Sequence, residues 1–190
     1  MLRHAGGVRI DHIIGLFRLW WIPEGAPPTA GTYVRYNHEA MIGIVALEAV
    51  RAGAVVVGED LGTVEPWVRH YLHARGLLGT SILWFELDRD GGGGPLPAER
   101  WRELCLSSVT THDLPTLAGV WTGADLESQR KSGASPDEKA QEQFRTKLVE
   151  VSQVEDQTNL EEVITKTFSK LAESPCAVVM ADLEAACAVT

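Results

Sequence analysis

Three short strings in this sequence place acidic residues directly after apolar segments. The strings are Arg9–His12, Gly58–Gly62 and Thr110–Thr116. A carboxylate that ends a buried parallel strand lies at the carboxyl edge of the sheet, where (β/α)-barrels carry their catalytic side chains. Two carboxylates at such an edge can cleave a glycosidic bond, one as nucleophile and one as general acid/base. We therefore expect Asp11, Glu59 and Asp113 to be the acids of one site.

The first string pairs a cation with an acid. Arg9 and Asp11 share one face of a strand, because side chains alternate with a period of two. A guanidinium beside the carboxylate favours its ionised form. An ionised carboxylate at a strand end is able to attack the anomeric carbon of a sugar. A structural ion pair is the commoner use of such residues, and the spacing alone leaves both interpretations open.

The second string follows three valines. The carboxyl of Glu59 loses solvation at the edge of this apolar wall, which favours the protonated form that a general acid needs. Asp60 is its neighbour, and spacing does not decide which of the two faces the site. Either acid also suits the N-cap of the helix that follows.

The third string pairs a histidine with an acid. His112 is suited to donate to a sugar hydroxyl, and Asp113 to support developing positive charge. A turn before Leu114 is the structural alternative. A Ser/His/Asp triad is a rival use, but no Gly-x-Ser-x-Gly string surrounds Ser107 or Ser108. The other histidines are too scattered for a zinc motif, so we expect neither a metal nor a cofactor.

Alternating short apolar runs and amphipathic stretches predict parallel βα units, and therefore an α/β fold. The expected strands are 7–10, 54–57, 81–85, 106–110 and 177–180, and the expected helices are 38–52, 65–75 and 97–104. Two segments interrupt this alternation. The range 20–36 is rich in Pro and Gly and is expected to be a long loop, in which Trp20 contacts substrate. The range 126–174 is polar and predicts a helical insertion with two amphipathic helices.

Composition limits the classes of partner. The chain has 190 residues, 45% of them hydrophobic, and a formal net charge of -9. This charge disfavours nucleic acid and anionic membranes. Three cysteines without metal-ligand spacing favour a reduced, cytoplasmic compartment. The first residues lack the apolar core of a secretory signal, and no apolar run approaches the length of a membrane span.

Taken together, the three acidic strings resemble the signature blocks of the 4-alpha-glucanotransferases, the amylomaltases or disproportionating enzymes of glycoside hydrolase family 77. The resemblance extends from about Gly7 to Trp121 and returns in part at 178–183. It implies a (β/α)8 barrel and a retaining mechanism with a covalent glucosyl-enzyme. Asp11 would match the nucleophile, Glu59 the general acid/base and Asp113 the stabiliser of the transition state. The implied substrate is a maltodextrin or another alpha-1,4-glucan.

The resemblance also implies residues that contact the substrate. These are Arg9, His12 and His112, beside Trp20 in the long loop. An incoming glucan hydroxyl, rather than water, would resolve the covalent intermediate. Two alternatives remain: an alpha-glucan hydrolase of the alpha-amylase superfamily, which shares the acids, and a truncated fragment without catalytic activity.

Family members are much longer, and three barrel strands precede their Arg-x-Asp block. We therefore expect a partial (β/α)8 TIM barrel that comprises strands four to eight. Residues 1–125 would form the C-terminal half of the catalytic barrel up to strand seven, 126–174 the helical insertion and 175–190 the last strand with the start of the next segment. Such a half-barrel would be inactive alone and would associate through its open sheet edge.

Overall fold

The computed structural model describes residues 2–155 and 157–188. The chain forms two compact units, Met1–Thr80 and Ser81–Thr190, and each combines helices with short strands. The predicted α/β class is therefore confirmed. Position 156, inside the expected helical insertion, and positions 189–190, at the end of the expected last segment, lie outside the described residues.

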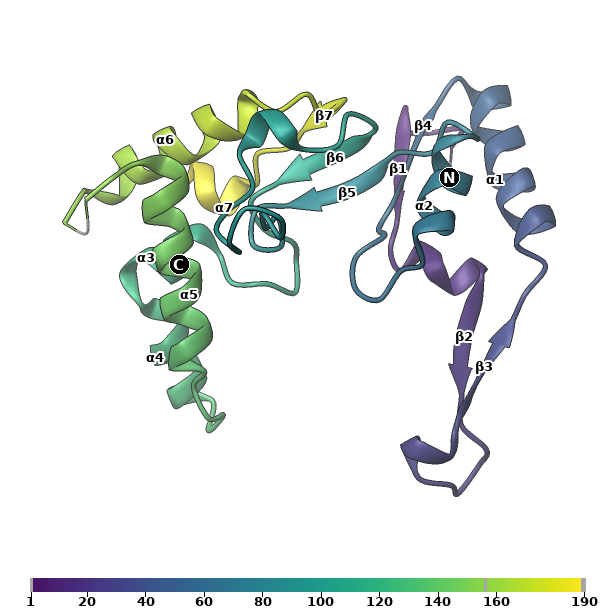
Figure 1. Ribbon diagram of the computed structural model, residues 1–190, viewed down its shortest axis with the longest axis horizontal. Helices are drawn as coiled ribbons and strands as arrows, with labels where there is room; N and C mark the ends of the chain where they lie inside the picture. Colours follow the sequence, from purple (N-terminus) through teal and green to yellow (C-terminus); the bar gives the residue numbers. More distant parts are fainter. Residues whose placement is uncertain (1, 156, 189–190) are drawn as a thin grey trace. The chain divides into compact units, whose positions relative to one another are not determined.

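Unit 1 contains a parallel pair of strands covered by helices (Figure 1). Its elements are β1 (Gly7–Ile10), the 3-10 helix Ile13–Leu16, β2 (Arg18–Trp21), the 3-10 helix Pro28–Ala30, β3 (Thr32–Arg35), α1 (His38–Ala52), β4 (Val55–Gly58) and α2 (Pro66–His73). In the register of the pair, Arg9 of β1 lies opposite Val57 of β4. Leu78 pairs with Val57 from the other side, so β4 is flanked on both sides.

The sequence explains where the elements of unit 1 begin and end. Asn37 caps α1, since its side-chain oxygen accepts a hydrogen bond from the backbone N–H of Ala40 at 3.1 Å. Gly53 ends the helix in the left-handed region with φ of 60°, a conformation that glycine adopts readily. The face of α1 that carries Ile42 packs with Val56 and Leu72 in the core of this unit. Strand β1 has its predicted bounds, and β4 lies one residue later than predicted.

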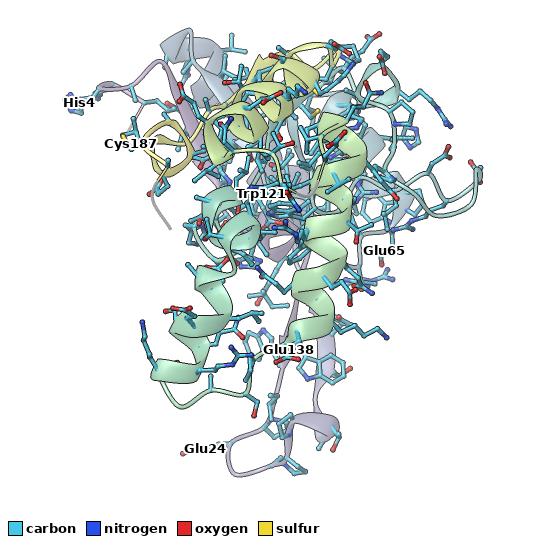
Figure 2. The ribbon with its side chains drawn as sticks, turned by 90° about the vertical axis from the view of Figure 1, so that its left-hand side faces the viewer. His4, Glu24, Glu65, Trp121, Glu138 and Cys187 are labelled. Carbon is cyan, nitrogen blue, oxygen red and sulfur yellow. The ribbon has the colours of Figure 1, made fainter. Side chains whose placement is uncertain are left out.

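The prediction of a long loop at 20–36 is wrong, because this region forms an antiparallel hairpin. Strands β2 and β3 pair with Trp20 opposite Tyr33, and the rings of these two residues meet edge to face at 5.0 Å. Figure 2 shows Glu24 at the tip of the hairpin. The Pro and Gly residues occupy the connection between the strands, while aromatic and β-branched residues pair on either side of it.

Unit 2 contains a three-stranded sheet in the order β5–β6–β7, together with five helices of the part that the structure describes. Its elements are β5 (Gly79–Ile82, which begins at the end of unit 1), the 3-10 helix Ala98–Arg100, β6 (Cys105–Ser108), α3 (Leu117–Thr122), α4 (Ala124–Lys131), α5 (Glu138–Ser152), α6 (Leu160–Ala172), β7 (Val178–Val179) and α7 (Leu183–Ala186). Strands β6 and β7 are parallel, with Leu106 opposite Val178.

The two amphipathic helices predicted between 126 and 174 are confirmed as α5 and α6. Their caps are Asp137 and Asn159, each of which accepts a hydrogen bond from a backbone N–H three residues later. The prediction of a helix at 97–104 is wrong. Only Ala98–Arg100 is helical there, as a 3-10 turn, and Trp101 is extended. Burial of the Trp101 ring, whose Nε1 donates to the carbonyl of Leu96 at 3.0 Å, outweighs the helical pattern of the segment.

The strand predicted at 81–85 begins and ends earlier, because the chain turns after Ile82. The backbone N–H of Phe85 donates to the carbonyl of Ile82 at 2.9 Å. Trp84 lies in this turn, where its ring is buried and packs against Phe144 of α5 with 4.9 Å between centroids. Trp84 therefore serves in the core of unit 2.

The helices of unit 2 also bury polar groups. Figure 2 shows Trp121 among densely packed side chains, and its Nε1 donates to the carbonyl of Thr158 at 3.1 Å. The Nζ atom of Lys147 donates to the carbonyl of Trp84 at 2.9 Å. Burial lowers the pKa of Lys147 to about 8, against the opposing influence of Glu86 and Glu150. Burial likewise raises the pKa of Asp125.

No helix in the described residues is both long enough and apolar enough to span a membrane.

Candidate active site

The acid of the first string lies directly after β1. The Arg9 Nη1 atom is 2.7 Å from Asp11 Oδ1, and both side chains are partly exposed. This contact confirms the predicted ion pair. One carboxylate oxygen of Asp11 is thus oriented by the guanidinium, while the other lies 3.5 Å from His12 Nε2.

The acid of the second string is buried and is held by the backbone. Glu59 is only 5% exposed, and each of its carboxylate oxygens accepts a hydrogen bond from a main-chain N–H. His12 donates to Oε2 and Leu61 donates to Oε1, both at 2.8 Å. The backbone of Glu59 also pairs with Ile10 and Ile13. The pairing of β1 with β4 therefore fixes the position of this carboxylate.

His12 connects the two acids. Its backbone is in the left-handed region, with φ of 47° and ψ of 51°, and its side chain is 83% exposed. The ring nitrogens lie 3.5 Å from Asp11 Oδ2 and 3.4 Å from Glu59 Oε2. One side-chain atom from each of the three residues lies within 4.8 Å of the others. The structure thus brings Asp11, His12 and Glu59 together at the carboxyl ends of two neighbouring parallel strands.

Asp60 points into a different network from Glu59. The Asp60 side chain is 1% exposed, and its Oδ1 atom accepts a hydrogen bond from the backbone N–H of Thr80 at 2.9 Å. Its Oδ2 atom accepts from Arg69 Nε at 3.2 Å. Neither acid is the N-cap of α2, since that position belongs to Glu65. Sequence spacing did not distinguish the two acids, whereas their hydrogen-bond partners do.

The acid of the third string belongs to unit 2. His112 and Asp113 are both exposed and lie in the turn between β6 and α3. The hydroxyl of Thr111 donates to Asp113 Oδ1. This turn ends at Thr116, whose side chain caps α3 by accepting from the backbone N–H of Gly119 at 2.9 Å. Asp113 is therefore positioned by a turn rather than by hydrogen bonds between paired strands.

Trp20 lies on β2 and is 45% exposed. Its Nε1 atom donates to the carbonyl of Pro28 at 3.0 Å. Glycine is required at position 31, because a Cβ atom at this position would lie only 2.3 Å from the indole Nε1 atom of Trp20. The indole of Trp20 is thus fixed within the hairpin and presents an aromatic surface to solvent.

The cluster of Asp11, His12 and Glu59 brings together three side chains that are able to bind a cation. Carboxylate oxygens and an imidazole are ordinary ligands for divalent metals. However, both oxygens of Glu59 already accept main-chain N–H groups, and Arg9 places a positive charge on Asp11. These donors compete with a metal ion for the carboxylate lone pairs, which disfavours a cation at this cluster.

A carboxylate pair at the ends of two neighbouring parallel strands is an arrangement that barrel enzymes acting on glycosidic bonds use. The sequence profile of glycoside hydrolase family 77, described as 4-alpha-glucanotransferase, matches residues 1–188. The chain belongs to this 4-alpha-glucanotransferase family.

Relatives in several bacteria resemble this chain. The 4-alpha-glucanotransferase of Mycobacterium tuberculosis (strain ATCC 25618 / H37Rv) is 78% identical over 134 residues, which are 70% of this chain and 18% of the relative. That of Haemophilus influenzae is 38% identical over 126 residues, which are 66% of this chain and 18% of the relative. The chain thus spans about a fifth of the length of the curated relatives it matches.

Two solved structures have a similar fold. The amylomaltase from Corynebacterium glutamicum gives a TM-score of 0.84 at 40% identity, over 94% of this chain and 28% of that one. The amylomaltase from Streptococcus agalactiae, solved in complex with acarbose, gives a TM-score of 0.60 at 16% identity, over 90% of this chain and 31% of that one. The second likeness concerns the fold alone.

Proposed function

We propose that this chain carries the catalytic carboxylates of a 4-alpha-glucanotransferase, which transfers alpha-1,4-glucan segments between maltodextrins by a retaining double displacement. The observation that supports this most is the meeting of Asp11 and Glu59, whose side-chain oxygens lie within 4.8 Å at the ends of two paired strands. Retaining enzymes place their two carboxyl groups about 5 to 5.5 Å apart.

Asp11 is the nucleophile in this proposal. The adjacent guanidinium of Arg9 orients the carboxylate, and the partial exposure of Asp11 leaves the carboxylate open to a sugar. Asp11 attacks the anomeric carbon and forms a glycosyl ester, while the bond to the leaving oxygen breaks. The donor glucan is transferred when the hydroxyl of an acceptor glucan, rather than water, attacks this ester.

Glu59 is the general acid/base. It donates its proton to the leaving oxygen in the first step and removes a proton from the 4-hydroxyl of the acceptor glucan in the second. Its backbone hydrogen bonds hold the carboxyl in one position for both steps. His12 lies beside both acids and is exposed, so it is placed to contact a sugar hydroxyl.

The remaining site residues have supporting roles in the proposal. Asp113 stabilises the positive charge that develops on the sugar ring, and His112 donates to a sugar hydroxyl. Trp20 offers an exposed aromatic face for stacking against a glucose unit. Arg9 acts as a positioning residue through its contact with Asp11.

We also propose that the chain is part of a (β/α)8 barrel and supplies its strands four to eight. Residues 1–125 would form strands four to seven, 126–174 a helical insertion and 175–190 the last strand. The parallel pairs β1–β4 and β6–β7 support this reading, since a barrel of this kind is built from parallel strands only. Closing such a barrel takes eight strands, so residues 1–190 alone are expected to leave maltotriose unchanged.

The test is a hybrid enzyme in which residues 1–188 replace the segment of the Corynebacterium glutamicum amylomaltase that superposes on them. With maltotriose, the hybrid is expected to produce glucose together with oligosaccharides longer than the substrate. Glucose and maltose without longer products would instead indicate the hydrolase alternative. A hybrid that unfolds cooperatively but does not change maltotriose would contradict the proposal, and the Asp11→Asn hybrid is the inactive control.

A further inference from the structure

Two of the three cysteines lie against one another in unit 2. Cys105 is the first residue of β6 and is fully buried, while Cys176 lies half-buried two residues before β7. Because β6 and β7 are parallel neighbours, both cysteines lie at the amino ends of paired strands. Their Sγ atoms are 3.3 Å apart. The third cysteine, Cys187, is exposed (labelled in Figure 2).

The surroundings make the two thiols unlike. The Cys105 thiol donates toward Cys176 Sγ and toward the carbonyl of Arg102, which is 2.8 Å away, and lies 3.4 Å from Ser81 Oγ. The hydrogen bond from Cys105 lowers the pKa of Cys176 to about 6, helped by Ser174 and Ser107 and opposed by burial and Glu86. The same interaction, together with burial, raises the pKa of Cys105. At neutral pH, Cys176 is thus the thiolate of the pair.

We propose that Cys105 and Cys176 form a redox-active dithiol, in which Cys176 attacks small-molecule disulfides and Cys105 is the resolving thiol. No other function derived above uses these residues. The sulfur–sulfur separation supports this directly, since a contraction of about 1.2 Å brings the atoms to bonding distance. A nucleophilic thiolate that is partly accessible beside a buried resolving thiol is the usual arrangement of redox-sensing cysteines.

The reaction conserves atoms and electrons when oxidised glutathione is the oxidant. The Cys176 thiolate attacks one sulfur of this disulfide, forms a mixed disulfide and releases one glutathione thiolate. Cys105 then loses its proton to solvent and attacks Cys176 Sγ, which releases the second glutathione thiolate. The protein loses two electrons, and oxidised glutathione is reduced to two thiols.

The bond would connect β6 to the segment that leads into β7. The chain between them includes helices α3 to α6 and the turn with Asp113, so the disulfide closes a long loop around the helical part of unit 2. A crosslink over a long loop restricts the unfolded chain more than the folded one. Cys105 is at the opposite end of β6 from the turn that carries Asp113, so the expected consequence is greater stability rather than altered chemistry.

The test uses the 190-residue chain with Cys187→Ser, which leaves only the pair. The folded protein is incubated with oxidised glutathione, and free thiols are then alkylated under denaturing conditions and counted by mass spectrometry. We expect an intrachain disulfide between Cys105 and Cys176, reversed by dithiothreitol, and a melting temperature that rises by about 5 to 10 °C. Two alkylated cysteines after this treatment, or a disulfide formed only in urea, would overturn the proposal.

Single variants distinguish the two roles. Cys105→Ala should accumulate a stable mixed disulfide on Cys176, because the resolving thiol is absent, whereas Cys176→Ala should form none. The rate at which iodoacetamide alkylates Cys176 should rise with pH, with a midpoint near pH 6 in the Cys187→Ser chain. In Cys105→Ala this midpoint should lie at higher pH, since the hydrogen bond donated by Cys105 is lost. A mixed disulfide on Cys105 in Cys176→Ala, or an unchanged midpoint, would contradict the assignment of the nucleophile.

Discussion

Glu59 and Asp113 are carboxylates that both follow a short strand, yet the two regions hold them in different ways. Glu59 comes directly after β4, is buried, and accepts main-chain N–H groups on both oxygens. Asp113 lies five residues after β6 in an exposed turn, where a threonine hydroxyl donates to it. The first acid is positioned by the pairing of two strands, and the second by the turn around it.

This difference suits Glu59 and Asp113 to the two different roles proposed for them. A general acid/base has to meet a leaving oxygen and then an acceptor hydroxyl at the same place, which favours a carboxyl with fixed geometry. A group that only stabilises charge tolerates more movement, since a Coulomb interaction falls off gradually with distance. Substitutions that affect one region at a time test whether the two acids differ in this way.

The largest effect is expected from Glu59→Gln in the hybrid enzyme. Glutamine keeps the shape but has no acidic proton, so disproportionation of maltotriose should fall by about 100- to 10,000-fold. Reaction with an alpha-glycosyl fluoride should persist, because fluoride leaves without protonation. Initial rates on both donors provide the measurement, with Glu65→Gln, which alters an ion pair with Arg18, as the control. Equal losses on both donors would reject the acid/base role.

A smaller loss, of about 100- to 1,000-fold, is expected from Asp113→Asn. Asparagine removes the negative charge that would support the oxocarbenium-like transition state. This charge is needed whichever leaving group departs, so the loss should be similar for maltotriose and for the glycosyl fluoride. A loss confined to maltotriose would give Asp113 a role in proton transfer and would reverse the comparison with Glu59.

Asp60→Asn should affect stability rather than activity. Asp60 is buried and accepts from Thr80 and Arg69, so loss of its charge should lower the free energy of unfolding by about 1 to 3 kcal/mol. Urea unfolding of the 190-residue chain at fixed concentration measures this. The control is Glu48→Gln, which alters an exposed pair with Arg51 and should cost less than about 0.5 kcal/mol. A stable but inactive Asp60→Asn hybrid would move the acid/base role to Asp60.

A further effect concerns pH and the buried amine of Lys147. Its pKa is lowered from 10.5 to about 8, so the folded state carries the cost of a buried charge below pH 8. Between pH 8 and 10.5 the folded amine is neutral while the unfolded one keeps its proton, and stability should therefore rise with pH by up to about 3 kcal/mol.

Urea unfolding at several pH values measures the contribution of Lys147. Lys147→Met should remove this rise, whereas Lys139→Met, an exposed lysine of the same helix, should leave it. An identical pH profile in Lys147→Met and the unsubstituted chain would show that this amine does not contribute.

The elements that sequence predicted best are those with strong local signals. Strand β1 and helix α1 have their predicted bounds, since Val8 and Ile10 on one face of the strand and a capped, apolar stripe in the helix specify them locally. The hairpin of β2 and β3 was missed because its aromatic residues remain exposed and its Pro and Gly content resembles a loop. The helix expected at 97–104 was wrong because burial of Trp101 outweighed the local pattern.

For the site, the sequence identified the acidic strings but not how each acid is held. The hydrogen bond from His12 to Glu59 exists only because β1 pairs with β4, and the bond from Thr80 to Asp60 depends on the chain returning beside β4. Contacts between residues far apart in sequence have no local signature. The separation of Glu59 from Asp60 was therefore not predictable from spacing.

The central claim is that Asp11 is the nucleophile beside Glu59, and trapping the covalent intermediate tests it most directly. The Glu59→Gln hybrid is incubated with alpha-maltotriosyl fluoride, quenched in acid and digested, and the modified peptide is sequenced by mass spectrometry. The fluoride forms the glycosyl ester, and without the base its transfer to an acceptor is slow. We expect a maltotriosyl ester on the carboxylate of Asp11. An ester on Asp60 or Asp113, or no covalent adduct while fluoride is released, would contradict it.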